Sequence, residues 1–112
     1  MPGKFELFQG KNKQYYFRLK AGNGECIMTS EGYTTKKAAL NGVAAVRKNC
    51  GNDGRFEVRE AKNGKKYFIL KAGNHQEIGR SQMYASTQSC SKGMASVKRN
   101  GSSDRCDDLT DD

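Results

Sequence analysis

The pattern of apolar and polar positions changes period once within the first fifty residues. Residues 4–9, 14–20 and 25–29 carry alternating or centrally placed apolar side chains, which predicts three short strands. After residue 35 the apolar spacing becomes i, i+3, i+4 and i+7, which is typical of an amphipathic helix: Ala39, Gly42, Val43 and Val46. Thr35 is a natural N-cap for this helix, because its hydroxyl can accept a hydrogen bond from an unpaired backbone N–H. This segment is therefore predicted to be β-β-β-α.

The same pattern returns 51 positions later. Residues 5–50 align with residues 56–101 without a gap, and 18 of the 46 aligned pairs are identical. The helical stripe recurs after a capping Ser86, as Cys90, Gly93, Met94 and Val97. A mid-helix glycine costs about 1 kcal/mol relative to alanine. Because both copies keep one, at Gly42 and Gly93, we expect each helix to approach the sheet or the other helix closely.

Two such repeats can stabilise each other. About fifty residues lie at the lower limit of independent stability, and a three-stranded sheet leaves its edges open. We therefore predict an α+β fold with two tandem β-β-β-α repeats, residues 4–50 and 55–101, related by a pseudo-twofold axis. Their edges would pair into a six-stranded antiparallel sheet with two helices packed on it. Residues 1–101 would form one domain, a monomer with an internal pseudo-dimer, and residues 102–112 a disordered acidic tail.

Three motifs carry a resemblance to a known family. In the first copy they are YFRLKAGNGE at residues 16–25, SEGY at 30–33, and NG at 41–42 followed by VRKN at 46–49. All three occur in the same order in both copies, and together they resemble the YegP-like family of uncharacterised bacterial tandem-repeat proteins. The resemblance covers residues 4 to about 101. It implies an α+β fold of paired β-β-β-α units, and it implies no activity.

Charge adds a candidate partner to this picture. The net charge is +8, and it is unevenly distributed. Residues 1–101 hold 19 Lys or Arg against 7 Asp or Glu, which gives +12, whereas residues 102–112 carry −4. A basic body favours an anionic partner, or serves solubility alone. No apolar run approaches the roughly 20 residues of a membrane span, and the first residues do not resemble a signal peptide, so we expect a cytoplasmic protein without membrane contact.

A residue that both copies need should recur at the offset of 51, but the cysteines and the single histidine do not. None has an equivalent of its own type in the other copy: Cys26, Cys50, Cys90, Cys106 and His75. The cysteines match no zinc-ligand spacing, and we expect them to be small apolar fillers in a reduced protein. His75 is the obvious candidate for a general base, but its equivalent is Gly24, so we expect a histidine in a surface turn.

Two pairs of candidate residues do recur in both copies. Glu6 and Glu57 would share a proton or a metal if the pseudo-twofold brought them together, but strand alternation favours solvent-facing carboxylates beside lysines. Tyr33 and Tyr84 precede the helices, where they would either line a ligand groove or anchor the start of each helix in the core; we expect anchoring. We therefore predict no catalytic residue, metal ligand or cofactor, and no enzyme.

Two binding functions remain open. The leading hypothesis is a small non-enzymatic cytoplasmic module that binds a protein or another macromolecule. The alternative is weak, sequence-tolerant binding of RNA or single-stranded DNA, because aromatic and basic residues interleave on the central strands. In that case Tyr16 and Tyr67 would stack on bases, and Arg18, Lys20 and Lys71 would contact phosphates. The acidic tail would then compete for the basic surface.

Overall fold

The computed structural model describes residues 3–74, 76–103 and 105–110. The first repeat contains β1 (Lys4–Gln9), β2 (Tyr15–Lys20), β3 (Cys26–Ser30) and α1 (Lys36–Asn49). A 3-10 helix, η1 (Asp53–Arg55), leads into the second repeat, which contains β4 (Phe56–Glu60), β5 (Lys66–Lys71), β6 (Glu77–Arg80) and α2 (Thr87–Asn100). The predicted pair of β-β-β-α units is therefore confirmed. A final short strand, β7 (Cys106–Asp108), was not predicted.

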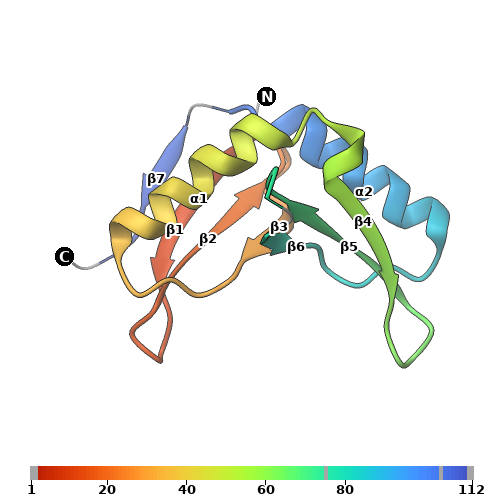
Figure 1. Cartoon of the computed structure of the whole chain (residues 1–112), viewed down its shortest axis with the longest axis horizontal. Coiled ribbons are helices and arrows are strands. Elements are labelled where there is room, and N and C mark those ends of the chain that lie inside the picture. The colour runs from red at the N-terminus through yellow and green to blue at the C-terminus, as the bar shows by residue number, and fades with distance from the viewer. Residues whose placement is uncertain (1–2, 75, 104, 111–112) are drawn as a thin grey trace.

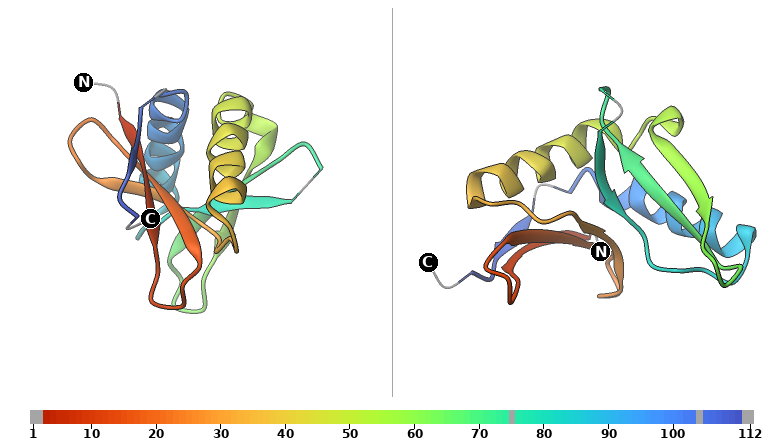
Figure 2. Two further views of the ribbon diagram at one scale, coloured as in Figure 1. Left: turned by 90° about the vertical axis from the view of Figure 1, so that its left-hand side faces the viewer. Right: turned by 60° about the horizontal axis from the view of Figure 1, so that its bottom comes forward.

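All seven strands form one sheet, in the order β4-β5-β6-β3-β2-β1-β7 (Figure 1). The two repeats meet in its middle, where β3 and β6 pair antiparallel with Thr29 opposite Arg80. Helix α1 packs on β1 and β2 of its own repeat and on β5 and β6 of the other, and α2 packs on β2, β3 and β5 (Figure 2). Because each helix contacts both repeats, neither half has a complete core by itself.

Most of the buried apolar side chains form one cluster that draws on both repeats. The face of the sheet toward the helices contributes alternate residues of its strands, and each helix contributes the predicted stripe. The largest fully buried members of this cluster are Phe5, Phe17, Leu19, Met28, Phe68 and Leu70, and the helices add Val43, Val46 and Val97. The predicted shared core is therefore confirmed. Neither helix, within the described residues, has the length and apolarity of a membrane span.

The start of α1 explains both the N-cap and the mid-helix glycine. The Thr35 hydroxyl accepts a hydrogen bond from the Ala38 N–H at 3.1 Å, as predicted. Tyr33 lies under the helix, with its ring stacked on Phe17 at a centroid distance of 6.3 Å. A Cβ atom on Gly42 would lie 2.5 Å from the Tyr33 hydroxyl and 2.7 Å from the Phe17 ring. The predicted close approach is therefore real, and its partner is the anchoring tyrosine.

The second repeat repeats this arrangement. The Ser86 hydroxyl accepts from the Ser89 N–H at 3.1 Å, and the Tyr84 ring stacks on Phe68 at 6.3 Å. A Cβ atom on Gly93 would overlap Tyr84, lying 2.6 Å from its Cζ. Burial raises the pKa of both anchoring tyrosines, which disfavours their phenolate form. The anchoring role is confirmed for both tyrosines.

The C-terminal segment contradicts the prediction of a disordered tail and of a six-stranded sheet. β7 pairs parallel with β1, with Cys106 opposite Phe5. The Phe5 N–H donates to the Arg105 carbonyl at 2.9 Å, and the Leu109 N–H donates to the Leu7 carbonyl at 2.8 Å. The prediction was wrong because it relied on the acidic composition of the segment, and composition does not show which distant residues the segment pairs with. The aspartates of β7 lie beside lysines of the body, so the segment adds a seventh strand and extends the folded region past residue 101.

Candidate functional site

The predicted nucleic-acid contacts lie on the face of the sheet that is turned away from the helices, which we term the outer face. Tyr16, Arg18 and Lys20 alternate along β2 with buried core residues. Tyr67 and Lys71 lie at the corresponding positions of β5, where the equivalent of Arg18 is the buried Ile69. The structure thus places all five on one face, but β3 and β6 separate the two groups. These five residues therefore form two clusters and not one continuous strip.

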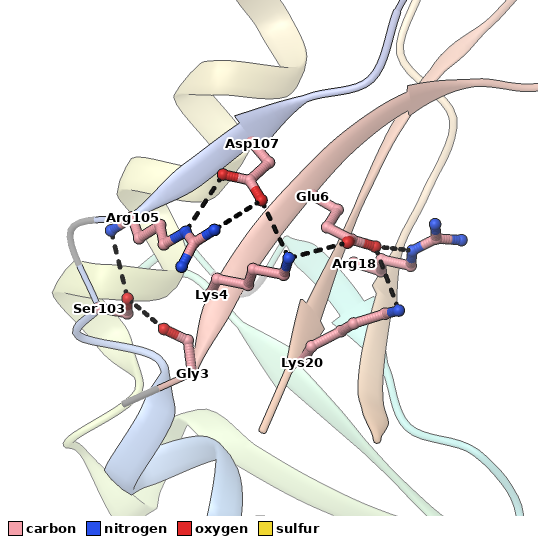
Figure 3. Close-up of polar contacts among 8 residues, drawn as sticks. All are labelled: Gly3, Lys4, Glu6, Arg18, Lys20, Ser103, Arg105 and Asp107. Carbon is pink, nitrogen blue, oxygen red and sulfur yellow. Dashed lines mark hydrogen bonds and ion pairs between the residues drawn. The ribbon is translucent and has the colours of Figure 1, made fainter. Parts of the chain in front are cut away.

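The first cluster surrounds Glu6 (Figure 3). The Glu6 carboxylate accepts from Arg18 Nε at 2.7 Å, and Lys20 Nζ and Lys4 Nζ lie at 3.4 and 3.5 Å. Its side chain is only 9% exposed. Burial acts to raise the pKa of this carboxyl, but the Arg18 hydrogen bond and the charges of Arg18 and Lys20 outweigh it and hold the pKa below its usual value. Arg18 and Lys20 therefore share one carboxylate, which balances part of their positive charge.

The second cluster surrounds Glu57, the equivalent of Glu6 in the other repeat. Lys71 Nζ lies 2.7 Å from one carboxylate oxygen, and Arg59 donates to the other. The hydrogen bonds from Lys71 and Arg59 lower the pKa of Glu57 to about 2. Four strands separate Glu6 from Glu57 in the sheet, so the two carboxylates share neither a proton nor a metal. The expectation that they face solvent beside cations is confirmed for Glu57, whose side chain is 41% exposed, whereas Glu6 is buried.

The aromatic rings of the outer face are also engaged within the chain. The Tyr16 ring stacks on Phe8 at 5.6 Å, and its hydroxyl accepts from Asn12 Nδ2 at 2.9 Å. The Arg18 guanidinium lies 4.6 Å from the centre of the Phe8 ring. Both tyrosines are half-buried, and Tyr67 carries an arginine above its ring. The stacking surface available to a base is therefore smaller than the sequence suggests.

That arginine is Arg80, which sequence reasoning missed. It lies 5.8 Å from the centre of the Tyr67 ring and forms ion pairs with Glu77 at 2.9 Å and Glu31 at 3.8 Å. Its equivalent in the first repeat is Thr29, so the comparison of copies gave no signal. The antiparallel pairing of β3 and β6 sets Arg80 near the pseudo-twofold axis. A charged residue in the predicted third strand of the second repeat was the available sequence clue.

The cysteines divide into two kinds. All four carry free thiols. Cys50 and Cys90 lie in the core and Cys106 packs against it, which confirms the filler role for these three. Burial raises the pKa of each of these thiols. Cys26 lies instead opposite Lys20 on the outer face. No group of three or more metal-ligating side chains occurs within the described residues, and His75 lies outside them.

A polar cleft of about 500 Å³ lies between α2 and the turn that joins β2 to β3. Its wall on α2 includes Ser89, Lys92, Ser96 and Arg99. Among the residues that the structure describes, no carboxylate forms an ion pair with Lys92 or Arg99. The equivalent positions on α1 are Ala38, Asn41, Ala45 and Lys48. The cleft on α2 is therefore the richer of the two in hydrogen-bond donors, and it lies on the helical side of the molecule.

The two edges of the sheet differ in how far they are covered. β7 covers the β1 edge, where Leu7 is 1% exposed. The equivalent residue on β4 is Val58, which is 44% exposed. Beside it runs a groove of about 380 Å³ between β4 and α2, lined by Phe56, Val58, Ser91, Met94, Ala95 and Lys98. No strand of the described chain pairs with the outer side of β4, so this edge and groove form the least covered apolar surface of the sheet.

Comparison with known proteins places the chain among uncharacterised relatives. A UPF0339 protein of Acinetobacter baylyi is 56% identical over 110 residues, covering 98% of this chain and 99% of the relative. The UPF0339 protein YegP of Escherichia coli is 54% identical over 110 residues, covering 98% of this chain and 100% of YegP. Both names describe proteins without an assigned activity.

Solved structures and a family match agree with the fold. The solution NMR structure of YegP from Escherichia coli, described as a protein of unknown function, has a TM-score of 0.94 at 54% identity and covers 100% of this chain and 97% of that one. A UPF0339 protein of Shewanella oneidensis has a TM-score of 0.92 at 50% identity, covering 98% and 93%. The family described as Domain of unknown function (DUF1508) matches twice, at residues 11–57 and 61–108. The chain therefore belongs to this family, in the YegP-like form with two tandem repeats.

Proposed function

We propose that this protein is a non-enzymatic cytoplasmic module that binds another protein, and that β4 and the adjoining groove on α2 form its contact surface. The observation that carries the proposal is the exposure of Val58 on β4, an edge strand that pairs with β5 on one side and with no described strand on the other. The equivalent Leu7 is buried by an added strand. Folded proteins usually cover or charge such edges, because exposed backbone groups and apolar side chains invite pairing.

The two repeated carboxylates and the buried thiols support a binding role over a catalytic one. The two repeated carboxylates are neutralised separately by cations, and their pKa values are lowered and not tuned toward neutrality. Burial raises the pKa of three thiols, which disfavours the reactive thiolate. What these groups provide is a stable framework, on which an edge strand is the accessible feature.

A capture experiment with matched variants tests this function. The tagged full chain, Val58→Lys and Met83→Lys would each be incubated with nuclease-treated lysate, and retained proteins identified and then purified for titration. Met83 is the control, because it is 48% exposed but does not line the groove. We expect a partner that binds the wild type and the control and is lost with Val58→Lys. Equal retention by all three chains, or no saturable binding to a purified partner, would contradict the proposal.

Weak binding of RNA or single-stranded DNA is the second candidate. Lys92 and Arg99 favour it, since both face a polar cleft without a carboxylate partner among the described residues. The outer-face set would contribute less than the sequence suggests, because its cations form ion pairs with Glu6 and Glu57, which balance part of their charge. Labelled oligonucleotides should then bind at about 50 mM salt and dissociate steeply toward 200 mM. Lys92→Ala should weaken binding more than Lys20→Ala, and absence of binding at low salt would exclude this candidate.

A further inference from the structure

The β1 edge shows how this fold receives an additional strand. The backbones of Phe5 and Leu7 face away from β2 and toward β7. Phe5 donates its N–H to Arg105, and Leu7 accepts at its carbonyl from Leu109. This is the parallel pattern, in which one residue of the receiving strand bonds the neighbours on both sides of its opposite residue. The chain thus contains its own example of strand addition.

The β4 edge has the same backbone geometry, and no strand of the described residues pairs with it. Phe56 lies opposite Leu70 on β5, and Val58 opposite Phe68, which repeats the register of β1 on β2 at an offset of 51. Phe56 and Val58 therefore direct their N–H and C=O groups away from β5. Within the described part of the chain, the N–H and C=O groups of Phe56 and Val58 have no backbone partner outside β5. Each is an exposed donor and acceptor pair that an extended chain can satisfy.

The side-chain surroundings of the two edges also correspond. At β1, Cys106 of the added strand packs against the core. Arg47 of α1 donates Nε–H to the Ser103 carbonyl at 2.7 Å. At β4, the groove lies open where a residue equivalent to Cys106 would sit. Lys98 takes the position of Arg47, with its Nζ 5.9 Å from the centre of the Phe56 ring. The second edge therefore has an apolar groove and a cation at the corresponding places.

Charge indicates which kind of chain fits this edge. Helix α2, which forms the other wall of the groove, contains three cations and no carboxylate, and one of these cations, Lys98, lines the groove. The carboxylates of β4 are already paired, Glu57 with Lys71 and Arg59, and Glu60 with Lys66. Pairing β4 with β4 of a second copy would bring two such helices together, which like charges oppose. An acidic segment would meet attraction at the same place.

We propose that β4 receives an extended segment of a partner protein as a parallel strand, in the manner of β7 on β1. The segment would place a small apolar residue in the groove beside Phe56 and carry acidic residues next to it, as Cys106, Asp107 and Asp108 do in this chain. This proposal rests on the proposed protein-binding function and specifies its mode. Recognition through backbone hydrogen bonds, with one pocket for a side chain, is the general physics of strand addition.

A peptide titration tests the mode directly. The probe is a synthetic peptide of residues 103–110 with Cys106→Ala, which removes the reactive thiol, and a scrambled peptide of the same composition is its control. The isotope-labelled full chain would be titrated and its backbone amide shifts followed by NMR. We expect saturable shifts in β4 and on the groove side of α2, with little change in β1 or α1, because the chain's own β7 occupies that edge.

Variants separate strand addition from general attraction. Val58→Pro removes an N–H that faces away from β5, so the β4–β5 ladder keeps its bonds. It should weaken peptide binding by about tenfold or more, whereas Val58→Thr keeps the N–H and should stay within about twofold. If Val58→Pro disturbs the fold, Ser91→Glu gives a second test. It adds a carboxylate at the groove and should weaken the acidic peptide, whereas Ser91→Ala should not.

Each other outcome overturns the strand mode. These outcomes are no shifts at millimolar peptide, shifts only in β1 and α1, equal binding of the scrambled peptide, insensitivity to both variant pairs, or a dimer formed through β4. The result is separable from the capture experiment. A partner lost with Val58→Lys but no peptide effect would leave the contact surface standing and refute strand addition. Failure of capture itself would refute the protein-binding function.

Discussion

Replacing Glu6 by Gln should destabilise this protein far more than the same change at Glu57, its equivalent in the other repeat. The Glu6 side chain is 9% exposed and has three cations within 3.5 Å. Glu57 is 41% exposed and has two cationic partners. Glutamine keeps the shape and removes the charge, so the substitution leaves Lys4, Arg18 and Lys20 near one another without their shared anion.

The structure sets the size of the effect at Glu6. A hydrogen bond to a charged group contributes about 1.5–3 kcal/mol, and breaking a fully buried ion pair costs about 3–5 kcal/mol. The cations around Glu6 are 27–33% exposed and keep part of their hydration, which places the cost near the lower value. We therefore expect a loss of about 2 kcal/mol, with a much smaller loss at Glu57, where solvent screens the charges.

Urea denaturation at neutral pH measures this difference. With a slope of about 1–2 kcal/mol/M for a protein of this size, Glu6→Gln should lower the midpoint by about 1–2 M. Glu57→Gln provides the matched control, since it is the same substitution at the same place in the repeat. Equal midpoints for the two variants would refute the reasoning that burial decides the strength of these clusters. A changed slope would point to an altered denatured state and would call for hydrogen exchange.

Three further predictions concern pH, packing and the added strand. The lowered pKa of Glu6 stabilises the folded state above its ordinary value of 4.5, so the stability difference between wild type and Glu6→Gln should shrink as pH falls below about 4.5; a constant difference in acid titrations would contradict this. Gly93→Ala should cost about 1–3 kcal/mol in urea denaturation, since overlap with Tyr84 exceeds the gain in helix propensity, whereas Gly51→Ala, which meets open space, should be nearly neutral. Removing residues 102–112 should accelerate hydrogen exchange at the Phe5 amide and leave β4 unchanged; unaltered exchange at Phe5 would show that β7 does not protect this edge.

The repeat made most of the fold predictable. Alternation along the strands, the helical stripes and the caps at Thr35 and Ser86 are local signals, and their recurrence at one offset removed most ambiguity. Mid-helix glycines, unfavourable by propensity alone, correctly indicated a close contact. The same reasoning could have identified the contacting group, because a tyrosine precedes the helix at the same distance in both copies.

The C-terminal strand and the balance of charge on the outer face were not predictable in this way. β7 lies beyond residues 4–50 and 55–101, which were predicted to form the two repeats, and its acidic composition favoured disorder. Its place depends on lysines far away in the sequence, since Lys4 pairs with Asp107 at 3.0 Å and Lys36 with Asp108 at 3.2 Å. Likewise, the sequence does not show that Arg18 and Lys20 have an anionic partner. The pairing of β1 with β2 brings the Glu6 carboxylate next to both of them. Counting charges along the chain says nothing about which of them meet.

The amino-acid sequence by itself determined the two β-β-β-α units, the residues that each buries, and the sharing of one core, because periodicity and capping act between residues close together in the chain. Only the tertiary structure decided which sheet edge is closed, which cations pair with carboxylates, and where an apolar groove stays open. Those features depend on contacts between segments up to about a hundred residues apart, such as Lys4 with Asp107. The two repeats share a pattern, but a single added strand makes their edges different, and the open edge at β4 is where we place the function.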